Sequence, residues 1–101
     1  MSLVGRAISE LIKNDEPVKA WVAVNQALNE DPDSPELLYL AGCVLRTQGH
    51  NGLALPLFSK ALSKDQKQPN LWMHYAATLH DLNQWDDAIK AFTVVHAMIP
   101  K

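Results

Sequence analysis

The sequence repeats itself every 34 residues, and this period constrains the fold more than any other feature. Apolar residues recur in the same columns of the repeat: Leu3, Leu37 and Leu71; Leu11, Leu45 and Leu79; Ala20, Ala54 and Ala88; Val24, Phe58 and Phe92; and Ala27, Ala61 and Val95. No insertion interrupts either junction between copies. Such a period predicts three stacked copies of one supersecondary unit, because a single copy cannot bury its apolar face alone.

The middle copy, residues 35–68, shows what the unit is. Its apolar and small residues read Leu38-x-x-Ala41-Gly42-x-x-Leu45, then Gly49, then Ala54-x-x-x-Phe58-x-x-Ala61-Leu62. Spacings of three and four predict two amphipathic helices. Gly49 can take the left-handed conformation that ends the first of them. The small side chains of Gly42 and Ala54 predict that the two helices approach closely.

This pattern predicts six helices, joined by short connections. They cover about residues 3–14, 17–30, 35–48, 51–64 and 69–82, and the sixth starts near Asp86 and ends between Met98 and Pro100. Pro17, Pro35 and Pro69 suit the first turns of their helices. Pro56 conflicts with this pattern, because it falls beyond the first turn of the fourth helix, where proline removes a backbone hydrogen bond. The chain forms one domain, with repeats at 1–34, 35–68 and 69–101.

The repeated unit resembles the tetratricopeptide repeat, whose pattern is Trp-x-x-Leu-Gly-x-x-Tyr, Ala-x-x-x-Phe, Pro. The third copy matches as Trp72-x-x-Tyr75-Ala76-x-x-Leu79, Ala88-x-x-x-Phe92 and Pro100, and the first as Val4-x-x-Ala7-Ile8-x-x-Leu11, Ala20-x-x-x-Val24 and Pro32. Ile8 stands where the family prefers a small residue, which predicts a splayed first hairpin. The resemblance covers essentially the whole chain. It implies an all-α solenoid of three helix-turn-helix repeats in a right-handed superhelix.

Charge and composition argue against several classes of protein. The net charge is −2, so no basic excess supports nucleic-acid binding. The single cysteine excludes an internal disulfide, which suits a reducing compartment. Arg6, Glu10 and Lys13 interrupt the start of the chain, which therefore does not read as a secretory signal. No stretch approaches the ~20 apolar residues of a membrane span. We expect a cytoplasmic protein without nucleic-acid or membrane partners.

Catalytic and metal-binding patterns are missing from the sequence. The four histidines form no i, i+4 pair, and Cys43 has no second cysteine beside it, so the spacing does not indicate a metal site. A Cys43 nucleophile paired with a histidine is the rival interpretation, but an inert small residue is favoured. There is no glycine-rich phosphate loop. We therefore expect a protein that is not an enzyme and needs no cofactor.

The resemblance implies a binding surface on the first helices of the three hairpins, which in this family line a concave face that holds extended peptides. Mapping that face onto this sequence gives a peptide-binding set of Ser9, Ile12, Lys13, Tyr39, Cys43, Arg46, Asn70, Met73, Ala77, His80 and Asp81. Ser2, Gly5, Glu36 and Thr47 map to the same face. Family members that clamp the C-terminal carboxylate of heat-shock chaperones resemble one another in a Lys, Asn, Asn, Lys, Arg set. The corresponding places here hold Gly5, Ser9, Leu40, Asn70 and His74, so we expect no binding of a free Glu-Glu-Val-Asp tail.

The last hairpin is expected to present an apolar outer side, because each repeat buries one face on its neighbour. The residues assigned to this terminal interface are Leu71, Leu82, Trp85, Ile89 and His96. Three explanations stay open: the sequence is part of a longer repeat protein, two chains cap each other as a homodimer, or the patch is small and tolerated.

The sequence thus favours a non-enzymatic module that binds a protein or peptide segment through its concave face. Two alternatives remain. The chain could be the substrate-selecting repeat region of a larger enzyme, such as a transferase, or a structural module that assembles with itself through its open ends.

Overall fold

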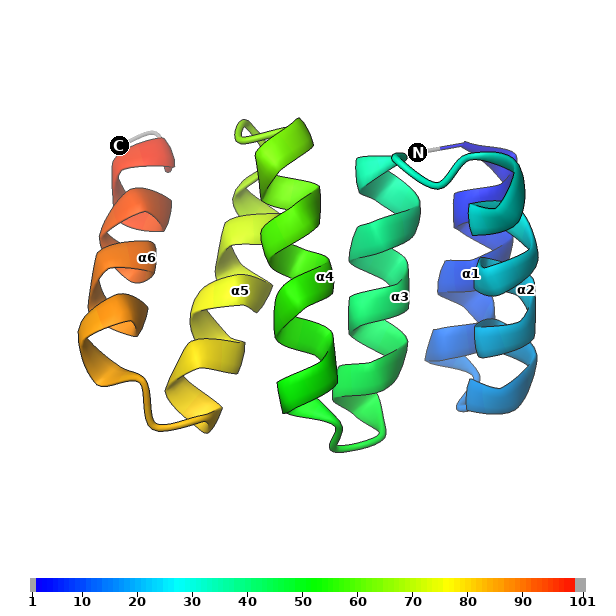
Figure 1. Ribbon diagram of the computed structural model, residues 1–101, viewed down its shortest axis with the longest axis horizontal. Coiled ribbons are helices and arrows are strands. Elements are labelled where there is room, and N and C mark those ends of the chain that lie inside the picture. The colour runs from blue at the N-terminus through cyan, green and yellow to red at the C-terminus, as the bar shows by residue number, and fades with distance from the viewer. Residues whose placement is uncertain (1, 100–101) are drawn as a thin grey trace.

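The computed structural model describes residues 2–99, and this part of the chain forms six α-helices and no strand. The helices are α1 (Leu3–Lys13), α2 (Pro17–Glu30), α3 (Pro35–Thr47), α4 (Asn51–Lys64), α5 (Pro69–Asp81) and α6 (Trp85–Met98). The all-α solenoid predicted from the sequence is confirmed, and every helix begins and ends within one or two residues of its expected bounds. Figure 1 shows the hairpins following one another in chain order, with α6 at one extremity and α1 with α2 at the other.

Contacts run in two ways along this row of helices. The two helices of each hairpin pack together, and the second helix of a hairpin also packs against the first helix of the next, as α2 does on α3 and α4 on α5. The first helices α1, α3 and α5 form a continuous row through the contacts of α3 with both neighbours. This row matters for function, because it carries one uninterrupted surface from residues of all three hairpins.

Local chemistry explains where the helices start. The hydroxyl oxygens of Ser2 and Ser34 accept hydrogen bonds from the backbone N–H groups of Gly5 and Leu37, and so cap α1 and α3. Ser2 also ties the first two hairpins together, because its hydroxyl donates to the Glu36 carboxylate at 2.9 Å. The entry of α1 is thereby held against the first turn of α3.

The three turns within the hairpins share one geometry. Asp15, Gly49 and Asn83 lie 34 residues apart, and each has a positive φ between 57° and 81°. After each of them, a backbone N–H reaches back to the carbonyl of Leu11, Leu45 or Leu79 at 2.9 Å, which is the Schellman motif of helix ends. Glycine takes this left-handed conformation freely, and aspartate and asparagine tolerate it better than most residues. The left-handed conformation predicted for Gly49 is confirmed, and the two other turns adopt the same conformation.

The close approach predicted at Gly42 occurs against the ring of Phe58. A Cβ atom on Gly42 would lie 2.6 Å from Phe58 Cε1, closer than two carbon atoms can pack. Phe58 is fully buried and belongs to a core cluster with Ala54, Ala61 and Leu62. The glycine therefore makes room for the largest side chain that the molecule buries completely.

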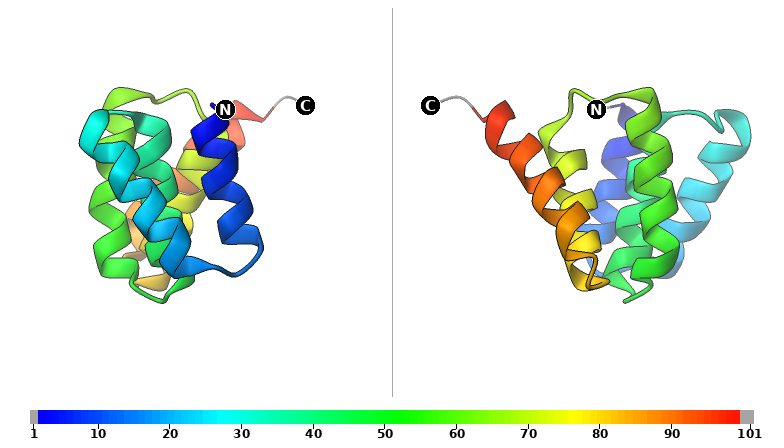
Figure 2. Two further views of the ribbon diagram at one scale, coloured as in Figure 1. Left: turned by 90° about the vertical axis from the view of Figure 1, so that its right-hand side faces the viewer. Right: turned by 60° about the vertical axis from the view of Figure 1, so that its left-hand side comes forward.

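In the first hairpin, other residues fill the space between the two helices. Ile8 stands in the column of Gly42 and is 1% exposed, and it shares a core cluster with Val24, which stands in the column of Phe58. Compared with the second hairpin, the first helix therefore carries a larger side chain and the second helix a smaller one. The contact between α1 and α2 is the least extensive of the three hairpins, and the two helices diverge from their connection in Figure 2. The predicted splaying is confirmed.

Pro56 does not end α4, which continues through it from Asn51 to Lys64. Its side chain lies on the exposed side of the helix. The carbonyl of Gly52, which loses its helical partner to the proline, can bond to water there. Ala54 and Phe58 on the buried side hold the helix in place.

The placement of Leu71 on the outer side of the last hairpin is wrong. Leu71 is 3% exposed and packs in one cluster with Phe58 and Leu62 of α4. Its column explains this position. Leu37, one period earlier, is likewise buried, in a cluster with Val24 of α2. Residues of this column face the preceding hairpin, not the following one.

Two glycine substitutions test the close approach of α3 and α4. Gly42→Ala is expected to overpack the site, which costs about 1–3 kcal/mol, of which about 1 kcal/mol is offset by the better helix propensity of alanine. Gly52→Ala is the matched control, because nothing lies within 4 Å of its Cβ position. That change is expected to raise the free energy of unfolding by about 0.4–1 kcal/mol.

Urea unfolding followed by circular dichroism measures both effects. The packing argument requires the two variants to shift the midpoint in opposite directions. A Gly42→Ala variant as stable as the Gly52→Ala variant would show that Phe58 moves aside without cost.

Candidate functional site

The row of first helices carries two hollows side by side. One has a volume of about 400 Å³ and lies between α1, α3 and α5, with Asn51 of α4 at its rim; we call it the Arg46 hollow. The other has a volume of about 440 Å³ and lies between the N-terminal turns of α3 and α5; we call it the Glu36 hollow. Tyr39 lines both, so the two hollows form one surface, here called the first-helix face.

Most of the residues mapped from the sequence lie at these hollows. The Arg46 hollow is lined by eight of them: Ser9, Ile12, Lys13, Tyr39, Cys43, Arg46, Thr47 and Asp81. Asn70 and Glu36 line the Glu36 hollow. Five others line neither hollow: Ser2, Met73 and His80 are exposed, Ala77 is half-buried and Gly5 is buried. The structure therefore brings most of the mapped residues of α1 and α3 together at the hollows. Part of the mapped set on α5 lies outside both hollows.

Several lining residues were not among those mapped. The Arg46 hollow is also lined by Leu40, Asn51 and His74, and the Glu36 hollow by Ser34, Pro35, Asp65, Gln68 and Leu71. Asn51 was not predicted to line the surface, because it begins the second helix of its hairpin and the sequence mapping considered only first helices. Leu40 and His74 could have been predicted, because the family resemblance assigns both of them to positions of the carboxylate clamp.

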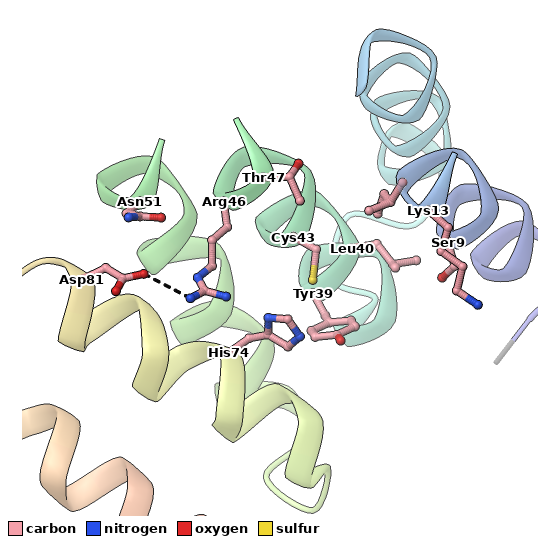
Figure 3. A pocket seen from close by; sticks show the side chains of 11 residues that line it. Ser9, Lys13, Tyr39, Leu40, Cys43, Arg46, Thr47, Asn51, His74 and Asp81 are labelled. Atoms are coloured by element: carbon pink, nitrogen blue, oxygen red, sulfur yellow. Dashed lines mark hydrogen bonds and ion pairs between the residues drawn. The ribbon is translucent and has the colours of Figure 1, made fainter. Parts of the chain in front are cut away.

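Arg46 and Asp81 form the ion pair that closes one side of the Arg46 hollow. Arg46 Nη2 donates to Asp81 Oδ2 at 3.1 Å and so joins the end of α3 to the end of α5, as Figure 3 shows. This hydrogen bond, together with one from His80, holds the pKa of the Asp81 carboxyl below its usual value. The pair places a carboxylate beside the charge of Arg46 and gives its guanidinium group a fixed partner.

An aromatic cluster of three rings lies beside the ion pair. The His74 ring packs edge-on against Tyr39, with centroids 5.3 Å apart, and stacks on Phe58 at 6.0 Å. Burial lowers the pKa of His74, and the positive charge of Arg46 lowers it further. His74 is therefore neutral at pH 7, and it presents an imidazole with one donor and one acceptor nitrogen.

Cys43 and Tyr39 lie in the same hollow and both stay protonated. Burial raises the pKa of the Cys43 thiol to about 11, despite opposing contributions from Tyr39 and Arg46. Burial also raises the pKa of Tyr39, with a smaller contribution from Cys43. A protonated thiol is a weak nucleophile, so the surroundings of Cys43 favour a packing role over a catalytic one.

Three buried polar atoms of the Arg46 hollow have no hydrogen-bond partner among residues 2–99. They are Arg46 Nε, Asn51 Oδ1 and His74 Nδ1. Arg46 Nε is a donor, Asn51 Oδ1 is an acceptor, and the role of His74 Nδ1 depends on the tautomer. Buried polar groups are nearly always paired in folded proteins. Three such exceptions therefore gather at one hollow.

The residues assigned to a terminal interface, Leu71 aside, lie on or near the outer side of the last hairpin. Trp85, Ile89 and His96 are exposed and Leu82 is half-buried. Trp85 packs edge-on against His80, with ring centroids 5.0 Å apart. This outer side lies apart from both hollows, because none of these four residues lines either of them.

Two further searches bear on the class of site. Within the described part of the chain, no group of three or more histidine, cysteine, aspartate or glutamate side chains is arranged to hold a metal ion. Among the helices of residues 2–99, none combines the length and the apolar character that crossing a bilayer requires.

Comparison with known proteins supports the repeat architecture. The family model of the tetratricopeptide repeat matches residues 45–98, and no curated protein matches the sequence. The fold is similar to PilF of Pseudomonas aeruginosa, with a TM-score of 0.83 and 20% identity over 91% of this chain and 41% of that one. It is also similar to MamA of Desulfovibrio magneticus, with a TM-score of 0.81 and 20% identity over 96% of this chain and 57% of that one.

A third similar structure is a complex of Naa15 and Naa10 bound to HypK. The TM-score is 0.77 and the identity 22%, over 97% of this chain and 15% of the matched one. At these identities the likeness shows the fold alone. The chain spans less than two thirds of the length of these three structures.

The thiol of Cys43 provides a chemical test of the hollow. A pKa of about 11 in place of 9 lowers the thiolate population at neutral pH about a hundredfold. We expect Cys43 to react with an aromatic disulfide reagent at least that much more slowly in the folded chain than in guanidinium chloride. Equal rates in the two solvents would show that the hollow does not shield the thiol.

The neutral state of His74 predicts a pH dependence of stability. The unfolded chain binds a proton at His74 near the ordinary pKa of 6.5, whereas the folded chain resists protonation because its pKa is lower. The stabilisation is therefore complete above the ordinary pKa and is lost as the pH falls below it.

Urea unfolding at about pH 7.5 and about pH 5.5 measures this loss. We expect the wild type to lose more free energy of unfolding over this interval than His74→Asn, which cannot titrate. Parallel losses in the two proteins would assign the pH dependence to other groups.

Proposed function

The chain belongs to the tetratricopeptide repeat family, and from this premise we propose that it is a non-catalytic interaction module that binds an extended peptide segment of a protein partner on its first-helix face. The segment would run across α1, α3 and α5, over the Arg46 and Glu36 hollows. Three properties of that face support this function: its unpaired polar atoms, its apolar lining and its small net charge.

The unpaired polar atoms of the Arg46 hollow carry the proposal. An extended peptide presents backbone carbonyl and N–H groups that no secondary structure pairs. A carbonyl can accept from Arg46 Nε, and an N–H can donate to Asn51 Oδ1, so main-chain groups of the peptide match both atoms. Each buried polar group left unpaired costs about 1–3 kcal/mol, and a bound peptide would relieve that cost.

The apolar lining supplies area for contact. Ile12 and Tyr39 are the partly exposed apolar residues that line the Arg46 hollow, and Tyr39 also lines the other one. Tyr39 lies between the two hollows and packs against His74, so its ring is held in place before a partner arrives. A side chain that is already ordered loses little conformational entropy on binding, which favours affinity.

The charges of the Arg46 hollow favour a peptide of low net charge. Lys13 and Arg46 are the cations that line it, and Asp81 neutralises Arg46 through their 3.1 Å ion pair. His74 adds no charge at neutral pH, because burial lowers its pKa. Ser9, Leu40 and His74 line the hollow where chaperone-binding relatives place clamp residues, and none of them offers a fixed positive charge to a carboxylate.

Peptide selection followed by variant binding tests the proposal. A random peptide library displayed on phage is selected on the wild-type chain, and the dissociation constant of a selected peptide is measured by calorimetry. We expect Arg46→Met and Asn51→Ala each to weaken binding about tenfold, since each removes one buried hydrogen bond worth about 1.4 kcal/mol.

The matched control is Val18→Ser on the exposed side of α2, away from both hollows. This variant is expected to bind the selected peptides as the wild type does, and circular dichroism checks that all three variants are folded. Selected peptides that bind Arg46→Met and Asn51→Ala as tightly as the wild type would refute the first-helix face as the binding surface.

A further inference from the structure

The outer side of α1 exposes apolar residues whose counterparts are buried in the other hairpins. Leu3 is 83% exposed, although Leu37 and Leu71 in the same column are buried against the preceding hairpin. Val4 is also exposed, whereas Leu38 in its column is buried, mainly in the cluster that its own hairpin forms with Phe58. We call Leu3, Val4 and the exposed Ala7 the N-face. It is the surface on which a preceding second helix would pack.

The outer side of α6 shows the complementary pattern. Phe92 is 38% exposed, whereas Val24 and Phe58 in its column are completely buried. Ile89 is 64% exposed, whereas Leu55 in its column packs against the cluster formed by α5 and α6. We call Ile89, Phe92 and His96 the C-face. It is the surface on which a following first helix would pack.

Inside the molecule, these two kinds of surface meet each other. Phe58 and Leu62 of α4 pack against Leu71 of α5, and Val24 of α2 packs against Leu37 of α3. At both internal junctions, a residue from a C-face column therefore packs against a residue from the Leu3 column of the N-face. Figure 2 shows α1 and α2 unobstructed at one extremity in its left view, and α6 unobstructed at the other in its right view.

We propose that copies of this chain associate head to tail, with the C-face of one copy on the N-face of the next. A second copy is the occupant that the structure favours, because each molecule carries both halves of a junction that it already forms twice internally. The contact would continue the 34-residue period from one chain to another. It is a heterologous interface, so each bound copy leaves one further face of each kind open.

His96 makes this junction weaker than the internal ones. Its column holds Leu28 and Leu62, which pack in the internal core clusters, and replacing leucine with an imidazole reduces the apolar area available for burial. Association is therefore concentration-dependent. The first-helix face lies on a different side of the helices, so the hollows stay open in the assembled form.

Two single variants, each blocking one face, provide the test. Leu3→Glu places a charge on the N-face, at a position in the first turn of α1 where an acid suits the helix. Ile89→Glu places a charge on the C-face, at a position that is 64% exposed. Val18→Glu is the control, since Val18 is 75% exposed but belongs to neither face. Circular dichroism checks each fold, and light scattering on a size-exclusion column follows mass across a dilution series.

Head-to-tail association predicts that the wild type and Val18→Glu gain mass with concentration, while each face variant alone stays a monomer. An equimolar mixture of Leu3→Glu and Ile89→Glu should then form a heterodimer of about twice the monomer mass and no larger species, since one intact junction remains between them. Dimers of Leu3→Glu alone would instead indicate a symmetric contact through α6 and overturn the proposal. A wild type that stays monomeric at every concentration, or a mixture that stays monomeric, would overturn it too.

Discussion

The contact between Gly42 and the Phe58 ring determines how the rest of this molecule is arranged. The missing side chain lets α4 approach α3 closely enough for the ring to be completely buried. The buried ring then supports His74 by stacking and lies beside Tyr39. One steric constraint in the core thereby places two of the residues that line the hollows. Core packing and the first-helix face are linked, because the ring that fills the core also contacts two residues that line the Arg46 hollow.

The first two hairpins fill the same two columns with different side chains, and the exchange follows volume. Gly42 faces Phe58 in the second hairpin, whereas Ile8 shares its core cluster with Val24 in the first. A protein interior tolerates such exchanges when the total volume is kept. The turns show the opposite behaviour. Asp15, Gly49 and Asn83 differ in chemistry but share a left-handed conformation. Few residue types tolerate that conformation, and these three are among them.

The sequence predicted the helices and their order because the period and the apolar spacing are strong signals. It predicted the α1 and α3 side of the first-helix face for the same reason: position within a repeat fixes the direction of a side chain. Asn51 could not be found that way, since its place at the hollow depends on how α4 starts beside α3. Leu71 was misplaced because helical spacing tells which side is apolar, but not which neighbour covers it.

Sequence patterns could not predict that Arg46 pairs with Asp81. They also could not predict that Arg46 lowers the pKa of His74. These residues are 35 and 28 positions apart in the chain, and only the packing of α3 on α5 brings them together. The same holds for the unpaired atoms of the Arg46 hollow. A sequence states which groups are polar, but whether each of them finds a partner depends on the relative placement of three helices.

The common geometry of the three turns has a consequence for how such a chain can grow. Because every hairpin closes with the same backbone conformation and joins its neighbour through the same columns, a whole unit can be duplicated or removed without redesigning any connection. Each duplication would lengthen the row of first helices by one helix and leave the existing hollows untouched. Gene duplication could therefore change the length of a recognised segment in whole-helix steps, while point mutations adjust its chemistry independently.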